Sequence, residues 1–424
     1  MKQTGYPLEQ ELGIRYYASD AEGIGGRLRS TPEDFLVEEI PQKDRGGTEG
    51  PYLICILTKQ NWELQHAVKE IAKRLGISHR RIGWAGTKDR NAITKQWISI
   101  YDVTADQVNA IRLRDISIQP VAQSNLALSL GDLEGNRFDI VIRDADGSAL
   151  EERVAAINET ARAGVPNYFG IQRFGAIRPV THQVGKWMLK GDYEQAVLTY
   201  IGLAYPDEPE EIRKIREEFL ATRDPRPAID NLPPQMNYER AMLHYLYSHP
   251  GEYGNALKEL PPKLLSMFVS AFQSWVFNTG LSRRFDDGLG LDEPVPGDRL
   301  IFANGRTDIV TQANKSAVSL HLARGRCSIA LFMPGRDPFD AQSTSERVTE
   351  TLLAEEGITA DDFARASTFV RTKFEGAYRP ISLKTDIESS ISGQDVRLKF
   401  SLPPGHYATT VCREFMKADP VRMI

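Results

Sequence analysis

The chain has 424 residues, more than one ordinary hydrophobic core holds, so two domains are expected. Its 41% hydrophobic and 26% charged residues are typical of a soluble globular protein. No segment offers the roughly 20 consecutive apolar residues that a membrane span needs, which excludes a membrane-spanning protein. A net charge of −5 argues against a protein coated with phosphate-binding residues.

Cysteine usage and the first residues bear on cofactors and location. Cys55, Cys327 and Cys412 are far apart and form no Cys-x-x-Cys pair, so buried thiols are expected rather than disulfides or structural zinc. The first seven residues lack the apolar core of a signal peptide, so a cytoplasmic location is expected.

The first 165 residues mix strand and helix patterns. Four apolar residues recur at helical spacing within 62–75, and Gly76 follows where a C-terminal cap belongs, which predicts a helix. Capping-box patterns at Thr104 and Ser148 predict helices that end near residues 113 and 162. Strands are expected over 35–40, 52–58, 97–100, 117–130 and 138–143, with a polar, glycine-rich loop over 41–50. This order favours an α+β fold with a mixed, mainly antiparallel sheet flanked by helices.

Residues 166–381 have a different character. Expected helices span 179–190, 193–201, 209–221, 237–247, 262–284, 345–355 and 359–365, with a proline-rich connector over 224–227. Past them, residues 395–402 alternate strictly between apolar and polar, which predicts a strand that returns to the first sheet. We therefore expect a body formed by residues 1–165 and 382–424, split by an insertion over 166–381.

The most distinctive stretch runs from Trp84 to Gln96. It places Asp89 between two cations, Lys88 and Arg90, which favour its ionised form. Such a carboxylate can attack or stabilise an electrophilic carbon, and cations beside it can hold phosphates. Residues 70–96 carry seven positive and two negative side chains, a local charge of +5 that is compatible with RNA binding. On charge alone, a solvated helix face and its loop explain this stretch equally well.

A second distinctive stretch, residues 166–175, combines Tyr168 and two phenylalanines with Gln172 and Arg173. This composition suits stacking on bases and gripping a nucleic-acid backbone. An aromatic turn that fills a domain junction is the equal alternative.

The Asp89 loop resembles the signature of the TruD family of tRNA pseudouridine synthases, in its archaeal type. The match covers residues 86–90 together with Ala92, Thr94 and Gln96. Four further stretches resemble the family in the expected order: Pro32 to Glu39, Gly135 to Phe138, Pro166 to Gly175, and Leu402 to Thr409 running on to Arg413-Glu414. The resemblance extends from near residue 29 to near residue 414 and is weakest in the middle third.

The resemblance implies a fold and a reaction. The fold is a pseudouridine-synthase catalytic domain, split as described, with a large inserted α/β domain named TRUD. The reaction converts a uridine of tRNA to pseudouridine, at uridine 13 of tRNA(Glu), with Asp89 as the catalytic residue. Phe35 and its basic companion Arg29 lie near that site, although the family often has Lys at the latter position. Phe138 holds the base, and Asn136 bonds a polar edge or orders the loop.

Partners and cofactors follow from the same reasoning. Side chains expected to contact tRNA are Lys88, Arg90, Arg80, Arg81, Tyr168, Gln172 and Arg173. No zinc spacing, Walker A loop or Rossmann fingerprint is present, so neither a metal nor an organic cofactor is expected. No obligate protein partner is implied, and a monomer or weak oligomer is expected.

Two other functions are compatible with the residues. A non-catalytic RNA-binding protein could use the same basic loop. A glycoside hydrolase could pair Asp89 with Glu38 or Glu39 as its two carboxylates.

Overall fold

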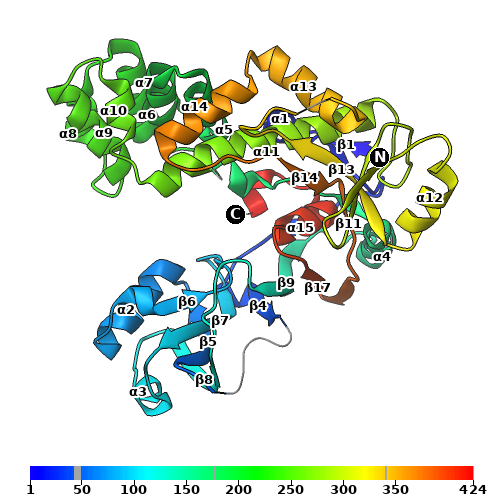
Figure 1. Cartoon of the computed structure of the whole chain (residues 1–424), viewed down its shortest axis with the longest axis horizontal. Helices are drawn as coiled ribbons and strands as arrows, with labels where there is room; N and C mark the ends of the chain where they lie inside the picture. Colours follow the sequence, from blue (N-terminus) through cyan, green and yellow to red (C-terminus); the bar gives the residue numbers. More distant parts are fainter. Residues whose placement is uncertain (43–48, 176, 340, 424) are drawn as a thin grey trace. The chain divides into compact units, whose positions relative to one another are not determined.

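The structure is a computed structural model, and it describes residues 1–42, 49–175, 177–339 and 341–423 (Figure 1). Residues 43–48 of the expected glycine-rich loop lie outside this description. The chain packs as two compact units: unit 1 is Met1–Tyr17 with Pro166–Leu383, and unit 2 is Ala18–Val165 with Lys384–Ile424. Residues 1–17, expected with the first body, thus pack with the middle of the chain. How these units divide the function stays a prediction.

Unit 2 is built on a nine-stranded sheet, counted over the described residues. Its main strand order is β16-β17-β9-β4-β7-β5-β8, with β3 paired to β9 and β6 paired to β7. Only β4 and β7 are parallel among these pairs, so the expected mixed, mainly antiparallel sheet is confirmed. The strands are β3 (Gly25–Arg27), β4 (Phe35–Pro41), β5 (Tyr52–Gln60), β6 (Ile82–Trp84), β7 (Ile93–Tyr101), β8 (Ile116–Ser124), β9 (Leu133–Ala145), β16 (Glu388–Ser392) and β17 (Asp395–Leu402).

The last strand returns to the first sheet as expected. β17 pairs antiparallel with β9, and Phe400 lies opposite Phe138 in this register. Apolar and polar residues alternate along β17, so every second side chain is buried. A segment more than 250 residues downstream in the sequence therefore completes the sheet that carries Phe138.

Within its described residues, unit 2 has four α-helices: α2 (Leu64–Leu75), α3 (Ala105–Asn109), α4 (Leu150–Ala163) and α15 (Ala408–Met416). The predicted cap of α2 is confirmed, because Gly76 has a φ of 67° and closes the helix in the left-handed conformation. The apolar face of α2 packs on β5 and β7.

Two helix starts differ in outcome. The capping box at Thr104 is confirmed, although α3 ends at Asn109, earlier than expected. The capping box predicted at Ser148 is wrong. The Ser148 hydroxyl donates to Asp146 Oδ2 at 2.8 Å, and α4 starts after Ala149 without a side-chain cap. A nearer carboxylate outcompetes the helix for the serine.

Unit 1 is mainly helical and has one four-stranded antiparallel sheet among its described residues, in the order β12-β11-β13-β14. Its helices are α1 (Pro7–Glu11), α5 (Thr181–Lys190), α6 (Tyr193–Gly202), α7 (Glu210–Thr222), α8 (Pro225–Asn231), α9 (Asn237–Ser248), α10 (Tyr253–Leu257), α11 (Pro262–Asp286), α12 (Lys315–Ala323), α13 (Thr344–Glu356) and α14 (Ala360–Val370). Its strands are β1 (Lys2–Gln3), β2 (Tyr16–Tyr17), β11 (Arg299–Phe302), β12 (Thr307–Ile309), β13 (Cys327–Met333) and β14 (Ala377–Pro380). The short strands β10 (Val165–Pro166) and β15 (Ser382–Leu383) lie where the chain passes between the units.

The expected connector at 224–227 is wrong, because these residues begin α8. Asp224 caps the helix by accepting a hydrogen bond from the Arg226 N–H at 3.0 Å, and Pro225 occupies the first turn. Proline is tolerated there because the N–H that it lacks has no helical partner at that position.

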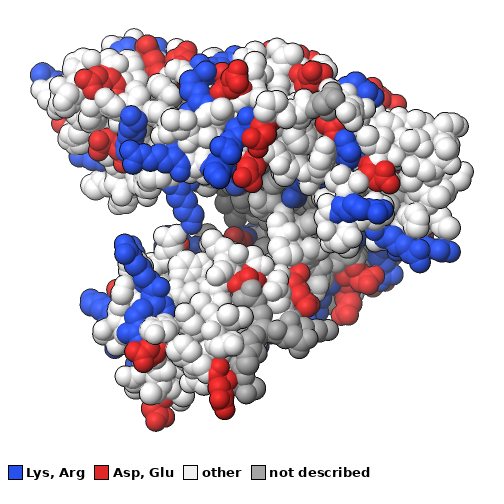
Figure 2. All heavy atoms as spheres, in the orientation of Figure 1, with Lys and Arg blue, Asp and Glu red and all other residues white. Residues whose placement is uncertain are grey.

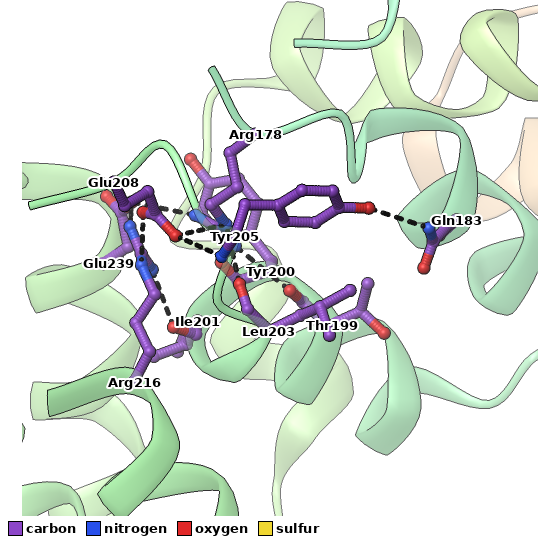
Figure 3. A network of polar contacts seen from close by, with 10 residues as sticks. All are labelled: Arg178, Gln183, Thr199, Tyr200, Ile201, Leu203, Tyr205, Glu208, Arg216 and Glu239. Carbon is purple, nitrogen blue, oxygen red and sulfur yellow. Dashed lines mark hydrogen bonds and ion pairs between the residues drawn. The ribbon is translucent and has the colours of Figure 1, made fainter. Parts of the chain in front are cut away.

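A buried charge network holds the α5–α9 region of unit 1 together (Figure 3). Arg216 donates to Glu208 Oε1 at 2.8 Å and to the Ile201 carbonyl oxygen at 2.7 Å, and it lies 3.5 Å from Glu239. Arg178 lies 3.9 Å from each of the same two glutamates, and burial lowers its pKa to about 10. Two arginines therefore share two glutamates in this network.

No helix in the described ranges has both the length and the apolar character needed to traverse a lipid bilayer.

Candidate active site

Asp89 lies in unit 2, on the irregular loop between β6 and β7. Its side chain is 58% exposed, and the Arg29 guanidinium, only 10% exposed, donates to Asp89 Oδ2 at 2.6 Å. The second guanidinium nitrogen of Arg29 donates to the Asn91 carbonyl oxygen at 2.8 Å. One arginine thus fixes both the carboxylate and the chain two residues beyond it.

The loop is also held from its inner side. The Gln96 amide donates to the Gly86 carbonyl oxygen at 3.0 Å, and the Lys59 ammonium donates to the Asp89 carbonyl oxygen at 3.0 Å. Lys59 is fully buried, and burial lowers its pKa to about 8. Because a loop without ladder hydrogen bonds must satisfy its carbonyl groups elsewhere, these side chains define its shape.

Sequence reasoning missed Lys59, although a signal was present. Along β5 the side chains of Leu53, Cys55 and Leu57 are buried, and Lys59 continues the same two-residue period. A lysine in the buried register of an apolar strand needs a polar partner.

Arg29 links Asp89 to the aromatic part of the site. Its guanidinium carbon lies 3.8 Å from the centroid of the Phe35 ring, and its backbone has a positive φ of 56°. Phe35 contacts Phe138 edge-on at 6.4 Å between centroids, and Phe138 stacks on Phe400 at 5.5 Å. The structure thus brings together Asp89, Arg29, Phe35 and Phe138 through consecutive contacts.

The predicted base-binding residues differ in exposure. Phe138 is 7% exposed, so only a small part of the ring is open to solvent. Asn136 lies two residues earlier on β9, and its Oδ1 atom is buried with no hydrogen-bond donor among the described residues.

The prediction that Lys88 contacts RNA is not supported by its position. Its side chain is 5% exposed and its ammonium lies 2.5 Å from Glu39 Oε2, while Glu39 itself is fully buried. The other oxygen of Glu39 accepts a hydrogen bond from the Trp97 N–H at 3.2 Å. The charge of Lys88 is therefore used inside the protein, and phosphate would have to displace a buried carboxylate.

The other predicted cations of unit 2 are more accessible. Arg80 and Arg90 are exposed, whereas Arg81 donates to the Tyr101 and Asp102 carbonyl oxygens and is 30% exposed. Figure 2 shows Lys and Arg side chains gathered over α2, where Lys69 and Lys73 are exposed. The basic surface therefore extends from the loop region onto the helix.

The predicted RNA-binding residues of unit 1 differ in burial: Tyr168 is buried, whereas Gln172 and Arg173 are partly exposed. Tyr168 is 1% exposed and its hydroxyl lies 2.7 Å from Ser282 Oγ, so it offers no face for a base to stack on. Arg173 donates to Ser274 Oγ at 3.1 Å, and Gln172 is half-buried. The first is a packing residue in this structure, and contacts of the other two with RNA stay a prediction.

The acids named for the hydrolase alternative are both engaged with cations. Glu38 lies 2.8 Å from Lys95 and 3.4 Å from Arg137, and Glu39 is paired with Lys88. Both carboxylates are therefore already engaged in ion pairs within the protein. Among the described residues, no cluster of three or more His, Cys, Asp or Glu side chains could hold a metal ion.

Comparison with known proteins gives one consistent family. The family model for tRNA pseudouridine synthase D (TruD) matches residues 11–415. The chain is 38% identical to a Methanococcoides burtonii protein described as "Probable tRNA pseudouridine synthase D", over 98% of both chains. It is 39% identical to a Thermococcus onnurineus protein of the same description, over 95% of this chain and 97% of the other. The crystal structure of a Methanosarcina mazei protein assigned to TruD superposes with a TM-score of 0.83 at 35% identity, covering 99% of this chain and all of the other.

Proposed function

We propose that Asp89 is the carboxylate with which this chain converts a uridine of tRNA to pseudouridine. The chain belongs to the TruD family of tRNA pseudouridine synthases and is therefore an isomerase. The proposed target is uridine 13 of tRNA(Glu). The reaction breaks the bond between N1 and C1′, turns the uracil, joins C5 to C1′ and releases the C5 proton. A carboxylate can assist by adding to C6 or C1′, or by easing the departure of uracil.

The observation that carries this proposal is the setting of Asp89. Its carboxylate is 58% exposed, yet Arg29 holds Oδ2 at 2.6 Å. No hydrogen-bond donor among the described residues contacts Oδ1, which leaves that oxygen for the substrate. Fixed geometry together with an accessible oxygen is what a nucleophile or electrostatic catalyst requires.

The aromatic residues beside Asp89 suit a base taken out of its stack. A uridine must leave its helix to expose C6 and C1′ to a side chain, and apolar rings commonly hold such a base. We propose that the uracil contacts the open part of Phe138 and that Asn136 bonds a polar edge of the base or orders the loop. Phe35 supports both Phe138 and Arg29 from below the surface.

The tRNA backbone is proposed to lie on the basic surface of unit 2. Exposed cations there are Lys69, Lys73, Arg80 and Arg90. Each phosphate contact releases counterions, so binding should weaken steeply with salt. Gln172 and Arg173 are proposed to contribute from unit 1.

The wider assignments complete the proposal. Residues 1–165 and 382–424 form the catalytic domain in this proposal, and residues 166–381 form the inserted domain. The enzyme works in the cytoplasm, where tRNA is processed, as a monomer or weak oligomer and without a metal or organic cofactor.

The experiment is tritium release from tRNA that carries C5-labelled uridine. Asp89→Asn should abolish release while tRNA binding remains. The matched control is Asp144→Asn, since Asp144 is also an exposed acid of unit 2 paired with an arginine, 2.8 Å from Arg27. A transcript of tRNA(Glu) with cytidine at position 13 should release no tritium.

Each rival predicts a different outcome. A non-catalytic RNA-binding protein would release no tritium even with Asp89 intact. A glycoside hydrolase would cleave carbohydrate and show a general acid in its pH profile. Full release by Asp89→Asn would refute the role assigned to this residue, and release from the cytidine-13 transcript would refute the position.

A further inference from the structure

We propose that Lys59 is a positioning residue for catalysis. It binds the main-chain carbonyl oxygen of Asp89, while Arg29 binds the carboxylate of the same residue. The inference rests on the proposed role of Asp89. It concerns a residue that contacts neither solvent nor substrate, and that acts only through the loop.

The geometry places the Lys59 ammonium within hydrogen-bond distance of the Asp89 main chain. Lys59 is the eighth of the nine residues of β5, which runs antiparallel to β7, and it lies opposite Thr94. From there its ammonium reaches the Asp89 carbonyl oxygen at 3.0 Å. The Asp89 residue is thus bonded at both ends, through its carbonyl to Lys59 and through its carboxylate to Arg29.

Folding alone does not account for a lysine at this position. The preceding residues of β5 on the same buried face are Leu53, Cys55 and Leu57, all of them apolar. A buried ammonium is costly even when hydrogen-bonded, and apolar side chains of similar volume are often neutral or more stabilising. A charged group retained in such a place indicates a requirement other than packing.

The surrounding charges explain how Lys59 keeps its proton at neutral pH. Burial and the charge of Lys88 lower its pKa, the charges of Asp89 and Glu63 raise it, and the net result is a pKa of about 8. The pKa is depressed relative to the unfolded chain, so the buried charge costs stability below pH 8. This cost disappears as the pH rises from about 8 towards the ordinary value of 10.5. The same rise removes the charge beneath Asp89, so activity and stability should change in opposite directions.

The test uses Lys59→Met, Lys59→Arg and the control Lys417→Met in the full chain. Lys417 is a second buried lysine of unit 2 that donates to main-chain carbonyl groups, at 2.5 Å from Ser19 O and 2.6 Å from Ala21 O. Because small misplacements of a catalytic group cost about 100-fold, Lys59→Met should lower kcat by about 10- to 100-fold and change KM less than threefold. Lys59→Arg should recover part of this loss, and Lys417→Met should keep the wild-type kcat wherever it remains folded.

The pH profile separates positioning from general stability. In the wild type, kcat should decline above about pH 8 while the melting temperature rises over the same range. Lys59→Arg, which keeps its charge, should lack both changes, and this arm decides the question even if Lys59→Met does not fold. The inference is overturned if Lys59→Met keeps the wild-type kcat, or if kcat of Lys59→Arg still declines above about pH 8 as in the wild type. Either result leaves the role of Asp89 intact. Loss of tritium release from the wild type itself would instead reject the proposed function.

Discussion

Lys88 and Lys95 offer a direct test of which basic residues serve the fold. Each pairs with a glutamate on β4, but Lys88 and Glu39 are 5% and 0% exposed, whereas Lys95 and Glu38 are 47% and 41% exposed. Lys88→Met would leave a buried carboxylate with one main-chain donor, a change that typically costs about 3–5 kcal/mol. Lys95→Met removes a solvated pair worth about 0–1 kcal/mol. The same substitution should thus differ in cost several-fold, although the two lysines pair with adjacent glutamates of β4.

The assay must report on unit 2, because a chain of two units does not unfold in one step. Hydrogen exchange of the slowest amides in β4 and β7 follows the opening of this sheet.

Salt-dependent tRNA binding supplies the second measurement. Arg90→Met, which removes an exposed cation, should reduce the slope of log K against log salt by about 0.7–0.9, the effect of one lost phosphate contact. Lys88→Met should leave that slope unchanged.

Two results would refute this reasoning. A stability loss in Lys88→Met that equals the loss in Lys95→Met would mean that the Glu39 pair is solvated in solution. A fall in the salt slope of Lys88→Met as large as that of Arg90→Met would mean that Lys88 binds phosphate, as the charge pattern first suggested.

Two further predictions concern buried groups. Arg216→Met removes the closest partner of two buried glutamates and should lower the stability of unit 1 by about 3–5 kcal/mol. Lys214→Met, which removes an exposed ion pair on the same helix, should cost less than about 1 kcal/mol. Equal melting curves for the two variants would contradict this prediction. Burial raises the pKa of the Cys55 and Cys412 thiols to about 12. A thiol reagent at pH 8 should therefore modify them only after unfolding. Rapid labelling of the native chain would contradict this prediction and would mean that the buried sites open to solvent.

The sequence was sufficient to predict features governed by local periodicity. The strand over 395–402 and the helix closed by Gly76 follow from repeating side-chain patterns, and both are confirmed. The Asp89 loop was recognisable because its residues lie close together in sequence. Arg29, 60 positions away, was placed near this loop only through the family resemblance. Lys59 was missed, because nothing local in the sequence links it to a loop 30 positions away.

Two of the residues predicted to contact RNA are buried, and their burial has one physical cause. Lys88 and Tyr168 were assigned to RNA from their residue types, as charge and aromaticity suggest exposure. Each instead has a buried partner far along the chain: Glu39 is 49 positions from Lys88, and Ser282 is 114 positions from Tyr168. Residue type indicates what a side chain can bind, but only the three-dimensional partner decides whether that capacity is already used.

The position of Arg29 shows why the site needs more than a positive charge there. A non-glycine residue with a φ of 56° costs about 1–2 kcal/mol of backbone energy, so the fold must compensate for it. The planar guanidinium does so by making two hydrogen bonds at once, to the Asp89 carboxylate and to the Asn91 carbonyl oxygen, while its face lies on the Phe35 ring. A lysine could supply the ion pair, but a single ammonium lacks the fork and the flat face that join all three contacts. The orientation of Asp89 in this chain therefore depends on the shape of the arginine as well as on its charge.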